Sequence, residues 1–222
     1  MQYLYLFTFG PSIFIVSYIY LSDRFREPAG LVISTFILGH LICFPAGILN
    51  NIIIFSSNNP KDMVFAAGLI EEPLKFSILY FLIRKRKMFN EPMDAIVYGT
   101  LISLGFATLE NIEYVFFNNE EISSLSIAIL RAFTAIPLHA CCGIIMGYYF
   151  GLYFFRNRSF TLIKSLLVPT FIHCTYNYLT GVNTLYFLLF LILVILYSLK
   201  LHNEVKREQK GKLFEAENKL KD

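Results

Sequence analysis

Apolar residues in this chain gather into seven long runs that are separated by short polar connections. A hydrocarbon core about 30 Å thick requires about 20 predominantly apolar residues for each crossing helix. The runs cover roughly residues 3–21, 30–56, 63–83, 93–117, 127–155, 161–179 and 183–200. The sequence therefore predicts an all-α, polytopic transmembrane bundle of about seven spans. The fifth run contains Pro137, and a helix break there would give eight spans.

The composition agrees with one membrane domain over residues 1–200, followed by a charged tail over 201–222. Hydrophobic residues make up 56% of the chain and charged residues 16%, whereas soluble domains have about 45–50% and about 25%. We expect the tail to be solvated and partly helical. A role in binding nucleic acid is not expected, because the basic residues lie at the predicted membrane edges.

The basic residues also predict an orientation in the membrane. The odd-numbered connections and the tail carry 16 Lys and Arg residues, whereas the even-numbered connections carry one, Lys61. Cytoplasmic loops of membrane proteins are enriched in Lys and Arg. The sequence therefore predicts an N-terminus outside the cell and a cytoplasmic tail.

Small residues predict one close helix contact. Gly143, Gly147 and Gly151 are spaced by four, which places them on one face of a helix. Such a face lets two membrane helices approach closely.

Ionisable residues inside the predicted spans are costly and indicate function by default. They lie on four spans: Glu71, Glu72 and Lys75; Glu110; His139; and His173. With a rise of about 1.5 Å per residue, Glu71, Glu110, His139 and His173 lie about 12, 10, 18 and 9 Å below the outer edge, respectively. The sequence thus predicts one polar site in the outer half of the membrane. The plainer alternative is that Glu71 and Lys75, four positions apart, only neutralise each other.

Carboxylates and imidazoles at one depth are suited to activating water. A glutamate can act as general base, and a neighbouring histidine or asparagine can donate to the oxyanion. The alternative is a zinc shell of Glu110, His139 and His173, with Glu71 or Glu72 as base. We expect no metal, because the sequence lacks an H-E-x-x-H motif.

Four motifs, in matching order, resemble the PrsW family of intramembrane proteases, which is related to CAAX endopeptidases and bacteriocin-processing proteins. GLIEEPLKF contains E-E-x-x-K as Glu71, Glu72 and Lys75, and LGFATLEN contains Phe106, Glu110 and Asn111. PLHACC and PTFIHCTYNY supply His139 and His173. This sequence has Asn177 where the family's pattern has an acidic residue, a change expected to tune His173.

The resemblance implies a multi-pass peptidase of the bacterial cell membrane that makes a site-1-type cut in a single-span protein. Its best-known members cleave an anti-sigma factor in a stress response. By the resemblance, Glu71 or Glu72 is the base, Glu110 and His139 are its partners, and His173 with Asn177 is the oxyanion or orienting group. Lys75, Phe106 and Asn111 support them. No cofactor is expected, and zinc is the alternative.

Two other functions fit the same residues. One is a non-enzymatic immunity or scaffold protein on the same fold. The other is a proton-coupled carrier that uses Glu71, Glu110 and the histidines as a relay. Carriers are often built from repeated halves with paired broken helices, and the sequence shows no such repeat.

Overall fold

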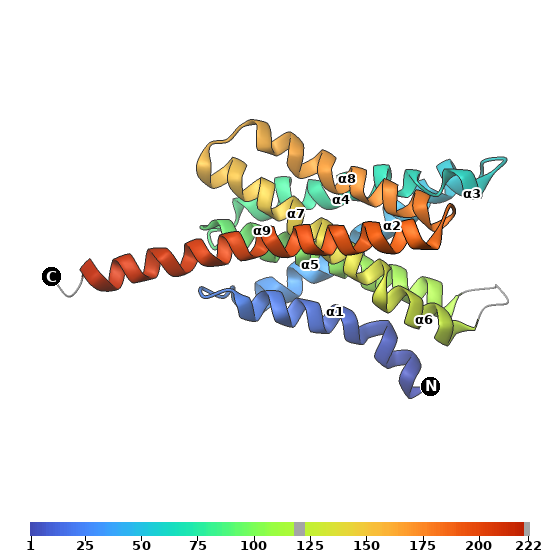
Figure 1. Cartoon of the computed structure of the whole chain (residues 1–222), viewed down its shortest axis with the longest axis horizontal. Coiled ribbons are helices and arrows are strands. Elements are labelled where there is room, and N and C mark those ends of the chain that lie inside the picture. Colours follow the sequence, from blue (N-terminus) through green and yellow to red (C-terminus); the bar gives the residue numbers. More distant parts are fainter. Residues whose placement is uncertain (118–122, 220–222) are drawn as a thin grey trace.

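The computed structural model describes residues 1–117 and 123–219, with side chains up to residue 211. Every regular element in these ranges is a helix (Figure 1). The elements are α1 (Gln2–Ser22), α2 (Ala29–Asn50), η1 (Asn51–Phe55), α3 (Pro60–Met63), α4 (Ala66–Phe81), η2 (Ile83–Lys85), α5 (Pro92–Phe116), α6 (Ser124–Phe133), α7 (Ala135–Arg156), α8 (Phe160–Thr180) and α9 (Thr184–Lys219). The predicted all-α class is confirmed.

Five helical segments of the described residues are long and apolar enough to cross a membrane. They are Gln2–Ser22, Ala29–Phe55, Pro92–Phe116, Ser124–Arg156 and Thr184–Gly211. The helix α4 has 16 residues and is shorter than a full crossing, whereas α8 is long enough but includes Lys164, His173 and Asn177. The count of seven or eight spans therefore stays a prediction.

The long apolar runs at 30–56 and 127–155 are not single regular helices. The first continues from α2 into a π-helical turn, η1. The second is divided at Thr134, whose dihedral angles of −125° and −70° separate α6 from α7. The break lies three residues before Pro137. This position is consistent with a proline in the first turn of α7, where its missing N–H costs no helical hydrogen bond.

The helix α5 lies at the centre of the bundle, and almost all of its residues up to Thr108 are buried. It packs against α7, α2 and α1. Its contact with α7 depends on the predicted glycine face, which is confirmed. A Cβ atom on Gly147 would lie 2.1 Å from the Ala95 carbonyl oxygen, and one on Gly143 would lie 2.6 Å from that of Gly99.

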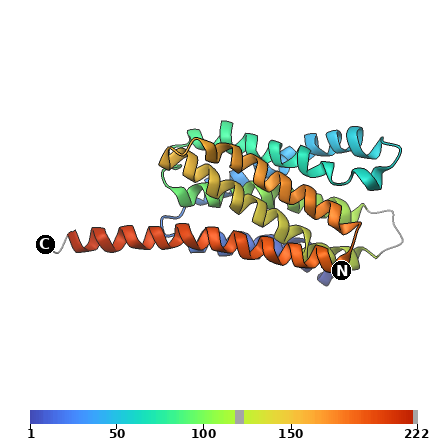
Figure 2. The same ribbon diagram turned by 45° about the horizontal axis from the view of Figure 1, so that its top comes forward.

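The connections lie at two opposite ends of the bundle. The α2–α3 and α8–α9 connections lie at the same end as the N-terminus, whereas the α1–α2 and α7–α8 connections lie at the other end (Figure 1). The helix α9 runs along the bundle and extends beyond that second end (Figure 2).

The tail from residue 201 is helical as expected, but one face of its first half is buried and not solvated. The helix α9 continues without interruption to Lys219, and Leu201, Val205 and Gln209 are buried. Hydrogen bonds hold this stretch, because Tyr148 donates to Glu204 over 2.8 Å and Gln209 donates to Asp23 over 2.8 Å. These partners are distant in the sequence, so composition alone does not reveal them.

Candidate active site

The structure brings together the predicted acids and imidazoles from three helices. Glu71 and Glu72 lie on α4, His139 lies on α7 and His173 lies on α8. Each offers one ligand atom, and these four atoms lie within 4.8 Å of one another. The four residues are 1%, 0%, 2% and 3% exposed, respectively. They therefore form one buried polar cluster and do not face lipid.

The ammonium group of Lys75 lies inside this cluster. Its Nζ atom is 2.8 Å from Glu72 Oε1, 3.4 Å from Glu71 Oε2 and 3.0 Å from His139 Nδ1. The ring of Phe106 closes one side, with its centroid 4.1 Å from Nζ. Lys75 thus pairs with both glutamates, and the alternative of an isolated Glu71–Lys75 pair does not describe the site.

The contacts fix the hydrogen positions on both histidines. An ammonium only donates, so His139 Nδ1 accepts from Lys75, and its Nε2–H donates to Glu110 over 3.1 Å. A carboxylate only accepts, so Nδ1–H of His173 donates to Glu72 Oε1 over 2.9 Å. His173 Nε2 is then left as an acceptor.

Glu110 connects this cluster to a second group of polar side chains. Arg131 on α6 donates to Glu110 over 2.7 Å and to Asn111 over 2.9 Å. Asn111 in turn donates to the Thr8 carbonyl over 2.9 Å, which ties the network to α1. Glu110 therefore orients the ring of His139 from the side opposite Lys75.

Two asparagines have contacts that the sequence analysis did not predict. The amide of Asn50 on α2 donates to Glu71 Oε1 over 3.2 Å. Asn177, expected to orient His173, instead donates to the Val64 carbonyl oxygen over 3.3 Å. The described hydrogen bonds thus place Asn50, and not Asn177, in direct contact with the acidic pair.

Sequence reasoning missed Asn50 and Arg131 as members of the site. Arg131 lies near the start of a predicted span, where a basic residue is ordinary. A usable signal was present, since an otherwise unpaired Glu110 at membrane depth requires a cationic or hydrogen-bonding partner.

A close helix contact sets the spacing of the site. A Cβ atom on Gly68 of α4 would lie 2.7 Å from the backbone nitrogen of Cys174 on α8. Gly68 therefore allows the two backbones to approach. Glu72, one helical turn farther along α4, then reaches His173.

The donor set is compatible with a metal ion. Two carboxylates and two imidazoles are typical zinc ligands, and Glu72 Oε2 is buried without a hydrogen-bond partner among the described residues. The four clustered residues differ from the expected set of Glu110, His139 and His173, because Glu110 is bound by Arg131. The Lys75 ammonium contacts three of the four groups, so an ion could use all of them only if the ammonium moved.

The charges in the site do not balance. With neutral histidines, Glu71, Glu72 and Glu110 carry three negative charges, and Lys75 and Arg131 carry two positive charges. One buried negative charge is left for a proton, a metal ion or the substrate to offset.

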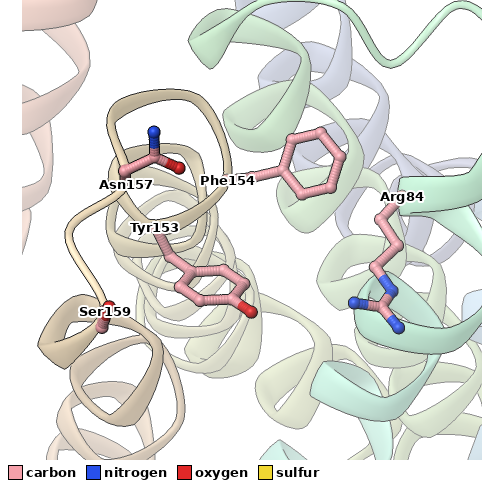
Figure 3. A pocket seen from close by; sticks show the side chains of 5 residues that line it. All are labelled: Arg84, Tyr153, Phe154, Asn157 and Ser159. Atoms are coloured by element: carbon pink, nitrogen blue, oxygen red, sulfur yellow. The ribbon is translucent and has the colours of Figure 1, made fainter.

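An open hollow of about 320 Å³ lies elsewhere, at the end of the bundle that carries the α7–α8 turn. It is lined by Arg84, Tyr153, Phe154, Asn157 and Ser159 (Figure 3). None of the clustered glutamates or histidines lines it, so it is not the place where a peptide meets them.

Comparison with known proteins identifies the family. The family described as PrsW family intramembrane metalloprotease matches residues 27–199. "Protease PrsW" of Geobacillus kaustophilus (strain HTA426) is 36% identical over 176 residues, which cover 77% of this chain and 76% of that protein. "Protease PrsW" of Bacillus subtilis (strain 168) is 36% identical over 190 residues, covering 81% and 84%.

The homologue of the same name from Oceanobacillus iheyensis (strain DSM 14371 / CIP 107618 / JCM 11309 / KCTC 3954 / HTE831) is 35% identical over 208 residues, covering 88% of this chain and 94% of that protein. No solved structure matches the chain. The sequence relatives support protease function, and the apolar helices support a multi-pass protein of the bacterial cell membrane. The chain belongs to the PrsW family of intramembrane proteases.

Proposed function

We propose that this membrane peptidase makes an outer-side cut in a single-span membrane protein of the anti-sigma-factor class, with a glutamate that activates water. The observation that carries the proposal is the environment of Glu72. Its Oε1 atom accepts from both Lys75 and His173, while its Oε2 atom has no partner among the described residues. A carboxylate held in this way has a free lone pair for the proton of a water molecule.

Glu72 is favoured over Glu71 as the base by the contacts of the two residues. Glu71 uses Oε1 to accept from Asn50 and Oε2 to accept from Lys75. Both of its oxygens are thus engaged, which suits a residue that holds the ammonium in place. The ammonium of Lys75 contacts Oε1 of Glu72 over 2.8 Å and leaves Oε2 without a partner among the described residues.

The two histidines are held in fixed orientations beside the proposed base. His139 is held between Lys75 and Glu110, so its ring is fixed from both nitrogens. His173 is fixed through Nδ1 alone. We assign to His173 the orienting role, because its Nδ1–H donates to Glu72 Oε1 and so holds the proposed base in place.

A metal ion is the alternative to direct activation by glutamate. Glu71, Glu72, His139 and His173 would hold it. Such an ion would polarise the scissile carbonyl and supply hydroxide near neutral pH. We favour the metal-free form, because the ammonium of Lys75 contacts three of these four groups and would repel a dication bound to all of them.

The outer-side cut follows from the proposed orientation. The clustered residues lie in the helix halves nearest the α2–α3 and α8–α9 connections, at the N-terminal end of the bundle. The basic connections and the tail lie at the other end, which the positive-inside rule assigns to the cytoplasm. Since the four residues are almost fully buried, a substrate helix reaches them only after the surrounding helices separate.

The proposal is tested with the purified full-length chain in liposomes and a set of labelled single-span proteins as candidate substrates. We expect the wild type to cleave at least one candidate. The double variant Glu71→Gln, Glu72→Gln should insert into the membrane but cleave at least about 100-fold more slowly. Equal rates would remove the glutamate mechanism. Chelator treatment should leave the rate unchanged, whereas loss of activity and its restoration by zinc would establish the metal form.

A further inference from the structure

The open hollow at the end of the bundle opposite the active site has no part in the proposed cleavage. It has a volume of about 320 Å³ and lies between η2 and the turn that joins α7 to α8 (Figure 3). Sites for small molecules usually measure about 300–1,000 Å³. The hollow is therefore large enough to hold a small polar group.

The side chains that line the hollow supply hydrogen-bond donors and one positive charge. Arg84 belongs to η2, Tyr153 and Phe154 belong to the end of α7, and Asn157 and Ser159 belong to the turn. The hydroxyl end of Tyr153 points toward the side on which Arg84 lies (Figure 3). None of these five lining residues is an acid, so the lining favours an anionic ligand.

The segments that form the two walls also lack acids along the sequence. Residues 73–90 contain no Asp or Glu, and neither do residues 122–203. Among the ion pairs of the described residues, Arg156 pairs with Glu208, whereas no carboxylate pairs with Arg84. The guanidinium of Arg84 is therefore available to an anion from outside the chain.

Stacking orients this guanidinium and leaves its N–H groups free. Its central carbon lies 3.9 Å from the centroid of the Tyr80 ring. A guanidinium stacked on an aromatic face keeps its donors at the edge of its plane, where two of them can bind one phosphate. Ser159 adds a further donor, because the hydroxyl of this N-cap residue makes no capping hydrogen bond to α8.

Exposed apolar side chains beside the hollow are suited to contact with lipid chains. Phe81 and Leu82 precede Arg84 closely in the sequence, and Phe160 directly follows Ser159. All three are exposed. The connections at this end carry the basic residues that mark a membrane edge. A phosphate that carries acyl chains therefore fits this position better than a free phosphate ion.

We propose that the hollow binds the phosphate group of a membrane phospholipid. Arg84 holds the phosphate through two N–H groups, and the hydroxyls of Tyr153 and Ser159 donate to its other oxygens. Basic pockets between helices at the membrane edge bind anionic lipid headgroups. The bound lipid connects η2 to the α7–α8 turn and stabilises the folded chain.

Native mass spectrometry of the purified full-length chain, delipidated in detergent, tests the proposal. The chain is titrated separately with phosphatidylglycerol, diacylglycerol and inorganic phosphate. We expect phosphatidylglycerol to bind saturably and to raise the unfolding temperature. Diacylglycerol, which lacks the phosphate, should do neither. Inorganic phosphate should bind at least about 10-fold more weakly than the lipid, because it gains no contact with the apolar side chains. Equal affinity for inorganic phosphate would overturn the assignment to a lipid.

Variants locate the site. Arg84→Gln should weaken the tightest phosphatidylglycerol site about 10-fold or more, and Arg84→Lys should recover only part of the affinity. Lys85→Gln removes the same charge from an exposed neighbour outside the lining and should match wild type.

A milder variant keeps the test decisive if a change at Arg84 prevents folding. Tyr153→Phe removes only a hydroxyl and should weaken lipid binding about 2- to 10-fold. The unfolding temperature without added lipid shows whether each variant is folded. The proposal is overturned if phosphatidylglycerol binds no more tightly than diacylglycerol, or if Lys85→Gln loses as much affinity as Arg84→Gln.

Discussion

His173 Nδ1 donates a hydrogen bond of 2.9 Å to Glu72 Oε1, although 101 positions separate the two residues in the chain. The bond depends on the close approach of α4 and α8 at Gly68. It leaves the second oxygen of Glu72 without a partner among the described residues. The packing of the α4 and α8 backbones at Gly68 therefore sets the position of the proposed catalytic base.

Gly68→Ala should disturb this coupling. The new Cβ atom would lie 2.7 Å from the Cys174 backbone nitrogen, so α4 and α8 must separate. We expect a loss of about 1–3 kcal/mol in stability and a fall in the cleavage rate. Gly47→Ala is the matched control, because a Cβ atom there has no neighbour within 4 Å. Equal behaviour of the two variants would contradict the role given to Gly68.

Lys75→Met should destabilise the chain by about 3–5 kcal/mol, because it leaves two buried carboxylates without their shared cation. Unfolding of the purified variant in mixed micelles measures the loss. Adding Glu72→Gln to Lys75→Met should restore part of it, since one uncompensated charge is then removed. Lys61→Met, an exposed change on α3, is the control. If Lys75→Met left the stability unchanged, the ammonium would not be the group that holds the acids together.

Arg131 is expected to act as a positioning residue through Glu110 and His139. Arg131→Gln removes the 2.7 Å contact with Glu110 and should lower kcat by up to about 100-fold, with a smaller effect on KM. Arg131→Lys keeps the charge and should recover part of kcat. Arg158→Gln, at an exposed residue, should match wild type. An equal loss in kcat for the Gln and Lys variants would argue against a charge-based role.

The proposed orientation predicts the location of the C-terminus. A fluorescent protein fused after Asp222 should fold and fluoresce in the cytoplasm, whereas alkaline phosphatase fused there should be inactive. Both reporters are measured in intact bacteria. Active phosphatase at this position would reverse the orientation and move the proposed cut to the inner side.

The helices themselves were largely predictable, because bilayer thickness fixes the length of apolar runs. The run at 93–117 corresponds to α5, Pro92–Phe116, within a residue at each end. The break at Thr134 and the burial of Gln209 were not predicted in place. Both depend on contacts with other helices, which a single-sequence pattern does not record.

The site was predictable for residues whose burial is costly and not for their ordinary-looking partners. Glu71, Glu72, His139 and His173 were expected to meet, and the structure places them together. Asn50 and Arg131 resemble common residues near helix ends, and only the packing of α2 and α6 brings them to the acids. Asn177 shows the reverse case, because its hydrogen bond goes to Val64 and not to the histidine on its own helix face.

Single-turnover cleavage by Glu72→Gln tests the account most directly, with Glu71→Gln and the exposed Glu113→Gln measured beside it. The variant keeps the shape of the side chain but removes the basic oxygen. We predict that Glu72→Gln slows cleavage at least about 100-fold, that Glu71→Gln has a smaller effect, and that Glu113→Gln matches wild type. Cleavage by folded, membrane-inserted Glu72→Gln at the wild-type rate would contradict the proposed role of Glu72 as the base.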